Sequence, residues 1–248
     1  MAGFTTKVFK VHDDYMTPNS AWDAIKDYIP HTVKIKDNLL ITNNHLEGVD
    51  HDCPDKRMRN YLTGSPDEFR PCVIWEAFYG DGKSGDYLKT LFDNDYTHFW
   101  DSKLLKNRTT PFIEDEDLEE LDKCYYKKKL EPKFIHKNID FFKHDLGDVI
   151  VSNCPFSLKK EVFTRLKELQ KPFIIICPSS MINTKYIREL FMHEEDKLQI
   201  IIPRRRIHFI KLIDGKIPED WNKKRCNFDC FYYCWKINFN RDITWLYD

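Results

Sequence analysis

Short apolar segments and amphipathic segments follow one another along the chain. Runs of apolar residues that are typical of buried strands lie at 73–75, 134–136, 148–151 and 173–177. Between the last two runs, apolar residues recur at helical spacing over 158–169. Strands that alternate with helices predict an α/β fold with a mostly parallel sheet and helices on both of its faces.

The N-terminal part predicts one more helix. Asn19 and Ser20 are residue types that often cap a helix. Trp22, Ile25 and Ile29 would then share one face, and their spacing indicates that this face is buried.

The C-terminal part changes pattern. Strand-like segments at 199–202, 206–212 and 228–239 are separated by turn-forming residues instead of long helices. We therefore predict an antiparallel hairpin that closes the edge of the sheet.

Length and composition fit one domain. A chain of 248 residues with 42% hydrophobic residues can bury a substantial core. Residues 31–71 have mixed character and residues 93–132 are charged and irregular, so we predict a single domain, 1–248, with insertions at these two places. The N-terminus lacks the apolar region of a signal peptide, and no apolar run is long enough for a membrane span. We expect an intracellular protein.

Charge and cysteine usage add two expectations. Acidic and basic residues are segregated into the runs 114–120, 127–129, 204–206 and 223–225. The formal net charge of −1 therefore does not exclude a nucleic-acid partner. The spacing of Cys226, Cys230 and Cys234 differs from that of zinc ligands, and eight cysteines in a long chain fit reduced thiols, so we expect no metal site.

A tetrapeptide suited to chemistry on an amino group directly follows the strand predicted at 148–151. It is Asn153-Cys154-Pro155-Phe156, and the carboxyl end of a strand is where open α/β sheets bind ligands. The Asn153 side-chain oxygen can accept one hydrogen bond from an exocyclic amino group. The Cys154 carbonyl can accept the other, because Pro155 favours an extended residue before it. These bonds would make the nitrogen lone pair available, while Phe156 could stack on the base. The alternative interpretation is a turn that caps the next helix.

A glycine-rich segment, residues 80–85, follows the strand predicted at 73–75 and precedes a helix with Tyr87, Leu88 and Leu91. Gly80 would allow the backbone to approach a ligand closely.

The same glycine-rich segment also satisfies a relaxed phosphate-loop pattern that ends in Lys83-Ser84. Two bulky aromatic residues inside the loop fit that alternative poorly. The candidate strands also do not end in an aspartate that could hold Mg²⁺.

Three segments together resemble the S-adenosylmethionine-dependent amino methyltransferases. Asn153-Cys154-Pro155-Phe156 is similar to their Asn/Asp-Pro-Pro-Tyr/Phe signature, with cysteine at the second position. The stretch from Glu76 to Gly82 is similar to their cofactor loop, and Asp140-Phe141-Phe142 resembles their Asp-Phe-Phe stretch. The resemblance covers most of the chain, is closest to viral and phage DNA adenine methyltransferases, and implies a class I, Rossmann-like fold.

The resemblance implies S-adenosylmethionine as cofactor. The residues that would bind it are Tyr15, Thr17, Pro18, Glu76, Phe78, Gly80, Gly82, Asp140 and Phe141. Glu76 would lie near the cofactor ammonium group, and Asp140 would accept hydrogen bonds from the cofactor adenine while Phe141 packs on that ring. An acidic residue for the ribose is expected where this chain has Lys137 and Asn138.

The resemblance further implies that adenine N6 in DNA receives the methyl group. The catalytic residues would be Asn153, Cys154, Pro155 and Phe156, and substrate contacts would come from Ser157, Lys159, Arg204 and Arg205. In duplex DNA the base must leave the stack to reach Asn153. No metal is required, because the positive sulfur already activates the methyl group.

Several alternatives remain open. Adenine N6 in RNA and the side-chain amide of a protein glutamine present a similar amino group. A protein of another class would be a catalytically inactive nucleic-acid-binding subunit or a phosphate-loop NTPase. Cytosine-C5 methylation is disfavoured, because the only Pro-Cys pair, Pro71-Cys72, precedes the glycine-rich segment.

Overall fold

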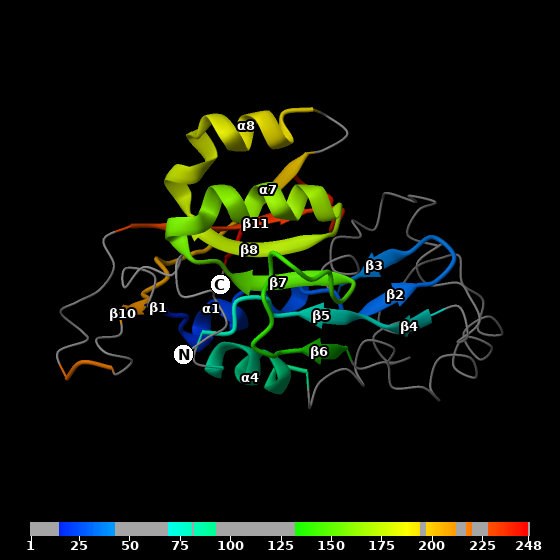
Figure 1. The fold of residues 1–248 in the computed structure, drawn as a ribbon, viewed down its shortest axis with the longest axis horizontal. Coiled ribbons are helices and arrows are strands. Elements are labelled where there is room, and N and C mark those ends of the chain that lie inside the picture. Colours follow the sequence, from blue (N-terminus) through cyan, green and yellow to red (C-terminus); the bar gives the residue numbers. More distant parts are fainter. Residues whose placement is uncertain are drawn as a thin grey trace.

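A central β-sheet organises the protein. The computed structural model describes residues 15–42, 69–80, 82–92, 132–193, 197–211, 217–219 and 228–247. Within these ranges the main sheet has seven strands (Figure 1). Their spatial order is β12 (Ile243–Trp245), β9 (Leu198–Ile202), β11 (Cys230–Trp235), β8 (Phe173–Pro178), β7 (Val149–Asn153), β5 (Val73–Trp75) and β6 (Lys133–Ile135).

The main sheet is mostly parallel, as the sequence predicts. Strands β6, β5, β7 and β8 are parallel neighbours, and β12 is parallel to β9. Strand β11 is antiparallel to both of its neighbours, β8 and β9. The fold is therefore α/β and Rossmann-like.

The predicted antiparallel pair is present, but it does not close the sheet. Strand β11 lies inside the sheet, and β12 forms the edge. Five of the six residues of β11 are buried, which is expected of a strand covered on both faces. The described part of the segment predicted at 206–212, which ends at Lys211, also lies outside the main sheet. Its strand β10 (Ile210–Lys211) pairs instead with β1 (Tyr15–Met16).

Helices cover both faces of the main sheet, which confirms the prediction. In Figure 1, α7 (Lys159–Leu169) and α8 (Lys185–Phe191) lie on one side, and α1 (Asn19–Asp23) and α4 (Lys83–Thr90) lie on the other. Side chains of a strand alternate between faces. Val149 and Val151 accordingly belong to the same core cluster as α1 and α4, whereas Ile150 belongs to the cluster with α7 and α8.

The first helix begins differently from the prediction. Pro18, not Asn19 or Ser20, occupies the N-cap position, and no side chain of the described residues makes a capping hydrogen bond. The Pro18 carbonyl accepts the Ala21 amide at 2.9 Å and starts the helix. A proline with extended ψ provides this geometry without a polar side chain. The chain continues into a 3₁₀ turn, η2 (Lys26–Tyr28).

The apolar face of this first segment is as expected. Trp22, Ile25 and Ile29 are all fully buried. They belong to the core cluster that covers the α1 and α4 face of the main sheet.

A separate three-stranded antiparallel sheet comes from the first predicted insertion. Its order is β3 (Leu39–Ile41), β2 (Thr32–Lys34) and β4 (Phe69–Pro71). Several features of the sequence lie outside the described residues, namely 43–68, 93–131, the charged runs at 114–120, 127–129 and 223–225, and Cys226. The assignment of both segments as insertions stays a prediction.

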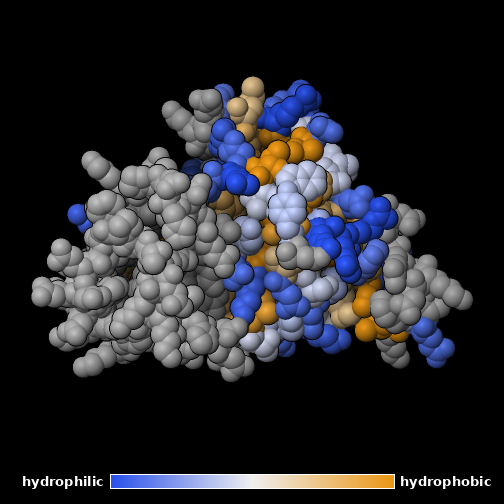
Figure 2. Space-filling view, turned by 180° about the vertical axis from the view of Figure 1, so that it is seen from behind, coloured by the Kyte–Doolittle hydropathy of each residue, from blue (hydrophilic) through white to orange (hydrophobic). Residues whose placement is uncertain are grey.

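The back face of the molecule mixes apolar and hydrophilic side chains (Figure 2). Among the described residues, Trp245 and Tyr247 are large apolar or aromatic side chains with high exposure. Within the residues that the structure describes, no helix is long and apolar enough to cross a membrane.

Candidate functional site

The strand order places a candidate site between β5 and β7. From β5 the chain continues to β6 on one side, and then to β7 and β8 on the other. Ligands of open α/β sheets bind outside the carboxyl ends of the strands where the order reverses in this way. Glu76 directly follows β5, and Asn153 is the last residue of β7. These carboxyl ends point to the left in Figure 1.

Glu76 has a buried carboxyl group whose two oxygens differ in their hydrogen bonding. Its side-chain Oε1 accepts a hydrogen bond from the Ser152 hydroxyl at 2.5 Å. Its Oε2 is buried and has no hydrogen-bond partner within the described residues. Burial is the largest influence on the group and raises its pKa to about 7, although hydrogen bonds from Ser152 and the Phe78 amide act in the opposite direction.

Asn153 presents a second buried acceptor at the same edge. Its Oδ1 atom is buried and makes no hydrogen bond to any residue that the structure describes. In the next strand, Ile176 pairs with Asn153, and β8 continues for two more residues to Pro178. A buried carbonyl oxygen without a partner loses its hydration without compensation, which favours sites where a ligand supplies the donor.

The side chain of Cys154 lies in the protein core. The residue is buried, and its Sγ lies 3.0 Å from Sγ of Cys177, the residue before the last in β8. Burial raises the pKa of the Cys177 thiol well above its ordinary value. Pro155 then adopts an extended conformation before the short 3₁₀ turn η5 (Phe156–Leu158). A role for Cys154 through its backbone carbonyl stays a prediction.

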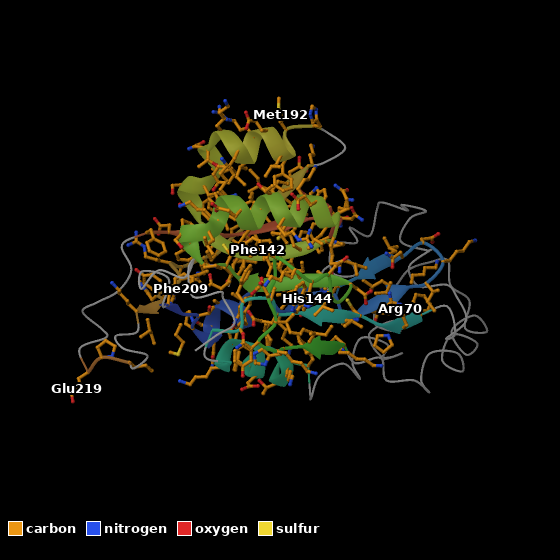
Figure 3. All side chains as sticks on the ribbon, in the orientation of Figure 1. Arg70, Phe142, His144, Met192, Phe209 and Glu219 are labelled. Atoms are coloured by element: carbon orange, nitrogen blue, oxygen red, sulfur yellow. The ribbon has the colours of Figure 1, made fainter. Side chains whose placement is uncertain are left out.

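Phe156 belongs to a cluster of four aromatic rings. Its ring centroid lies 6.0 Å from Tyr15, 5.7 Å from Phe209 and 5.2 Å from Phe228. The pairing of β1 with β10 brings Tyr15 to this place from the other end of the chain. Figure 3 shows Phe209 on the side of the molecule to which β5 and β7 point. The structure thus joins the predicted cofactor residue Tyr15 to the predicted catalytic residue Phe156.

The glycine-rich loop requires glycine where the backbone turns. Gly80 has φ +55° and Gly82 has φ +88°, a region that residues with a Cβ rarely adopt. A Cβ at Gly82 would also approach the Tyr79 hydroxyl to 2.9 Å. At Gly85, a Cβ would collide with the His136 ring, which stacks on Tyr79 at 4.7 Å. The first turn of α4 therefore packs closely against His136, which follows β6.

The two predicted cofactor aromatics meet beneath the loop. The Phe78 and Phe141 ring centroids are 4.9 Å apart, and Trp75 lies 5.7 Å from Phe141. Both oxygens of Asp140 have local partners. Oδ1 accepts the Phe142 amide at 3.0 Å, and Oδ2 lies 3.1 Å from the Lys143 ammonium. A further contact between Asp140 and a cofactor stays a prediction.

Comparison with known proteins identifies no family for this chain. No protein-family model matches the chain, and no curated protein matches it. Among solved structures, it is similar to a candidate class I S-adenosylmethionine-dependent methyltransferase from Listeria monocytogenes. The identity is 12%, the TM-score is 0.31, and the match covers 70% of this chain and 57% of that chain. The match thus spans less than two thirds of that protein, and a likeness of this size assigns no function.

The remaining predicted residues lie at or near the surface, with one exception. Ser157, Arg204 and Arg205 are exposed, Lys159 and Pro18 are partly buried, and Thr17 is buried. The loops after β7 and β9 reach the same edge, because these strands run in the same direction. The next arginine, Arg206, donates a hydrogen bond to Asp229 at 2.6 Å.

Sequence analysis missed two buried polar residues at this edge. The strand predicted at 148–151 stops before Ser152, and no role was predicted for this residue, because its contact with Glu76 joins positions that are 76 apart in the sequence. His136 was read as a strand residue but follows β6, and its side chain is only 4% exposed. Its Nδ1 lies 3.5 Å from Asp86 Oδ1, and its Nε2 has no partner in the described ranges. Burial lowers the pKa of His136.

Proposed function

We propose that the protein is an S-adenosylmethionine-dependent methyltransferase that transfers a methyl group to adenine N6 in DNA. One observation supports this most directly. Glu76 Oε2 and Asn153 Oδ1 are both buried without a partner among the described residues, and they lie at the carboxyl ends of the neighbouring strands β5 and β7, where the strand order reverses. One acceptor suits a cationic donor molecule, and the other suits the amino group of a target.

The residues around Glu76 fit the proposed cofactor. A carboxylate with a free oxygen complements the ammonium group of its methionine part. The positive φ angles of Gly80 and Gly82 allow close approach of the backbone, and Phe78 and Phe141 offer an apolar floor. When bound, the cofactor supplies a methyl group that its positive sulfur has already activated.

The residues around Asn153 fit an amino group as acceptor. Asn153 Oδ1 would accept one hydrogen of that group, and the Cys154 carbonyl would accept the other. Both bonds strengthen as the nitrogen becomes tetrahedral and positive, so they lower the barrier more than they tighten binding. Because nearby rings already pack on Phe156, the base would stack against one exposed part of this aromatic cluster.

Charge near the site supports a nucleic-acid substrate over a protein glutamine. Arg204 and Arg205 are exposed on the loop after β9, and Lys159 begins α7 directly after the Asn153 tetrapeptide and its turn. Such side chains suit the phosphates that flank a target base. The choice of DNA over RNA rests on the resemblance to viral and phage enzymes.

The phosphate-loop alternative has less support. In a phosphate loop the hydroxyl after the lysine holds Mg²⁺. Here the Ser84 hydroxyl accepts a hydrogen bond from the Trp22 indole at 3.0 Å. Phe78, within the same loop, is buried in an aromatic cluster instead of leaving room for phosphates.

The proposed function is tested by product analysis. The protein is incubated with S-adenosylmethionine and, separately, with adenine-containing DNA, RNA of the same sequence and an unrelated protein. We expect N6-methyladenine in the DNA by mass spectrometry. Methyl transfer only to RNA or protein would correct the acceptor. Binding of Mg·ATP without binding of S-adenosylmethionine would overturn the proposal.

A further inference from the structure

A buried serine connects the two unpartnered acceptors of the site. Ser152 is fully buried in β7, immediately before Asn153. Its hydroxyl donates to Glu76 Oε1 at 2.5 Å and accepts the Phe78 amide at 3.2 Å. Ser152 therefore contacts both the carboxylate that follows β5 and the glycine-rich loop, and it is itself part of the strand that ends at Asn153.

The direction of these hydrogen bonds is fixed by their chemistry. A backbone amide can only donate, so the Ser152 oxygen accepts from Phe78. The single hydroxyl hydrogen is then free to point at Glu76. This bond occupies Oε1 and leaves Oε2 as the remaining acceptor of the carboxyl group.

The same bond favours the charged form of Glu76. Burial opposes ionisation, whereas a hydroxyl that donates to a carboxylate favours it. Within the described part of the chain, no charged side chain contributes to the shift. The contributions come from burial, from the Ser152 hydroxyl and from the Phe78 amide. Ser152 is thus the side chain that offsets burial at this group.

We propose that Ser152 is a positioning residue, which favours the ionised form of Glu76 and orients it so that its free oxygen binds the ammonium group of the cofactor. The inference rests on the proposed function, because it assumes that the cofactor occupies this side of the site. It also links capture of the cofactor to β7, the strand that presents Asn153 to the acceptor.

The test compares Ser152→Ala with Ser152→Thr, which keeps the hydroxyl. Val151→Ala is the matched control, because Val151 is equally buried on the same strand but belongs to the core cluster on the other face. Binding of S-adenosylmethionine is measured by calorimetry from about pH 5.5 to 7.5 in the absence of an acceptor, a range that spans the titration of a perturbed carboxyl.

For the unmodified protein, affinity should fall about tenfold per pH unit below the pKa of Glu76, because one proton must leave before the cofactor binds. In Ser152→Ala the fall should begin at higher pH, and affinity at pH 7 should be about tenfold lower, the scale of one hydrogen bond to a charged group. Ser152→Thr and Val151→Ala should keep the original pH profile.

A second measurement does not depend on the cofactor. The Glu76 carboxyl is titrated by carbon NMR in the free protein, with Glu76→Gln to assign its signal. Ser152→Ala should raise the pKa of Glu76, and Ser152→Thr should not. An unchanged carboxyl titration in a folded Ser152→Ala variant would overturn the inference. Failure of the unmodified protein to bind S-adenosylmethionine would overturn the proposed function instead, whatever the titration showed.

Discussion

Asp148 and Glu76 are carboxylates at opposite ends of the β5 and β7 pair, and their surroundings differ. Asp148 accepts two hydrogen bonds from Arg70, at 2.6 and 2.8 Å, and one from the Val73 amide at 2.8 Å. Figure 3 shows Arg70 on the side away from the carboxyl ends of the strands. Glu76, by contrast, keeps Oε2 without a partner among the described residues.

The pKa values of the two groups move in opposite directions. Burial acts to raise the pKa of Asp148, but the hydrogen bonds from Arg70 and the Val73 amide outweigh it, and the pKa is lowered. At Glu76 burial prevails and raises the pKa to about 7. Asp148 therefore ties β4 to the main sheet as a satisfied ion pair. Glu76 remains a costly buried group, as expected where a ligand completes the site.

The largest expected effect concerns Asn153, whose proposed role in methyl transfer differs from the roles of both carboxylates. Asn153→Ala should lower single-turnover methylation of DNA by about two or more orders of magnitude, the usual scale for one preorganised polar group. Affinity for S-adenosylmethionine should change little, because Glu76 and the glycine-rich loop are intact. Calorimetry on the same preparation is the control. Methylation at the unmodified rate would remove Asn153 from the catalytic assignment.

Neutralising each carboxylate tests the comparison directly. Glu76→Gln should weaken S-adenosylmethionine binding by about 10 to 100-fold, because a charge-assisted hydrogen bond is lost. Asp148→Asn should leave that affinity unchanged but lower the free energy of unfolding, because Arg70 loses its charged partner. Calorimetry and urea denaturation measure the two effects. Equal loss of affinity in both variants would show that the two ends of the sheet do not have separate roles.

The pH dependence of stability should also separate the two groups. The pKa of Glu76 is raised in the folded protein, so its contribution to the free energy of unfolding is fully present below about pH 4.5 and is lost as pH rises through about 7. The size of this contribution is about 3 kcal/mol. The pKa of Asp148 is lowered, so its contribution is present above its unfolded value and is lost as pH falls through its folded value.

These contributions to the free energy of unfolding are measured by denaturation across a range of pH. The unmodified protein is compared with the Glu76→Gln and Asp148→Asn variants. Glu76→Gln should remove the loss of stability between about pH 4.5 and 7. Asp148→Asn should retain that loss and instead flatten the acid limb. A Glu76→Gln profile that matches the unmodified protein near neutral pH would contradict the assignment of a raised pKa.

The sequence predicted those parts of the fold that local pattern encodes. Apolar runs predicted β5 to β8, and helical spacing predicted α7. The spacing of apolar residues along the chain indicates which residues share a buried face. The position of β11 inside the sheet was not predictable in this way, because a strand's pattern does not name its partners. The Pro18 cap was missed because its backbone, not its side chain, starts the helix.

The candidate site was predicted in the same uneven manner. Glu76 and Asn153 each follow a recognisable strand, so both were found. The contact of Tyr15 with Phe156 depends on the pairing of β1 with β10, which lie far apart in the sequence. Ser152 was missed because its importance appears only when Glu76 lies beside it.

The smallest expected effect concerns Cys154, the position where this chain differs from the signature it resembles. The proposed role uses the backbone carbonyl, and the thiol instead contacts Cys177 at 3.0 Å, within the core. Cys154→Pro restores the family residue and Cys154→Ser keeps a small side chain, so both should methylate at rates of the same order as the unmodified protein. Single-turnover rates measure this, with cofactor affinity as the control for folding. Loss of turnover in both variants with affinity retained would mean that the sulfur itself takes part, because the two replacements share only its absence.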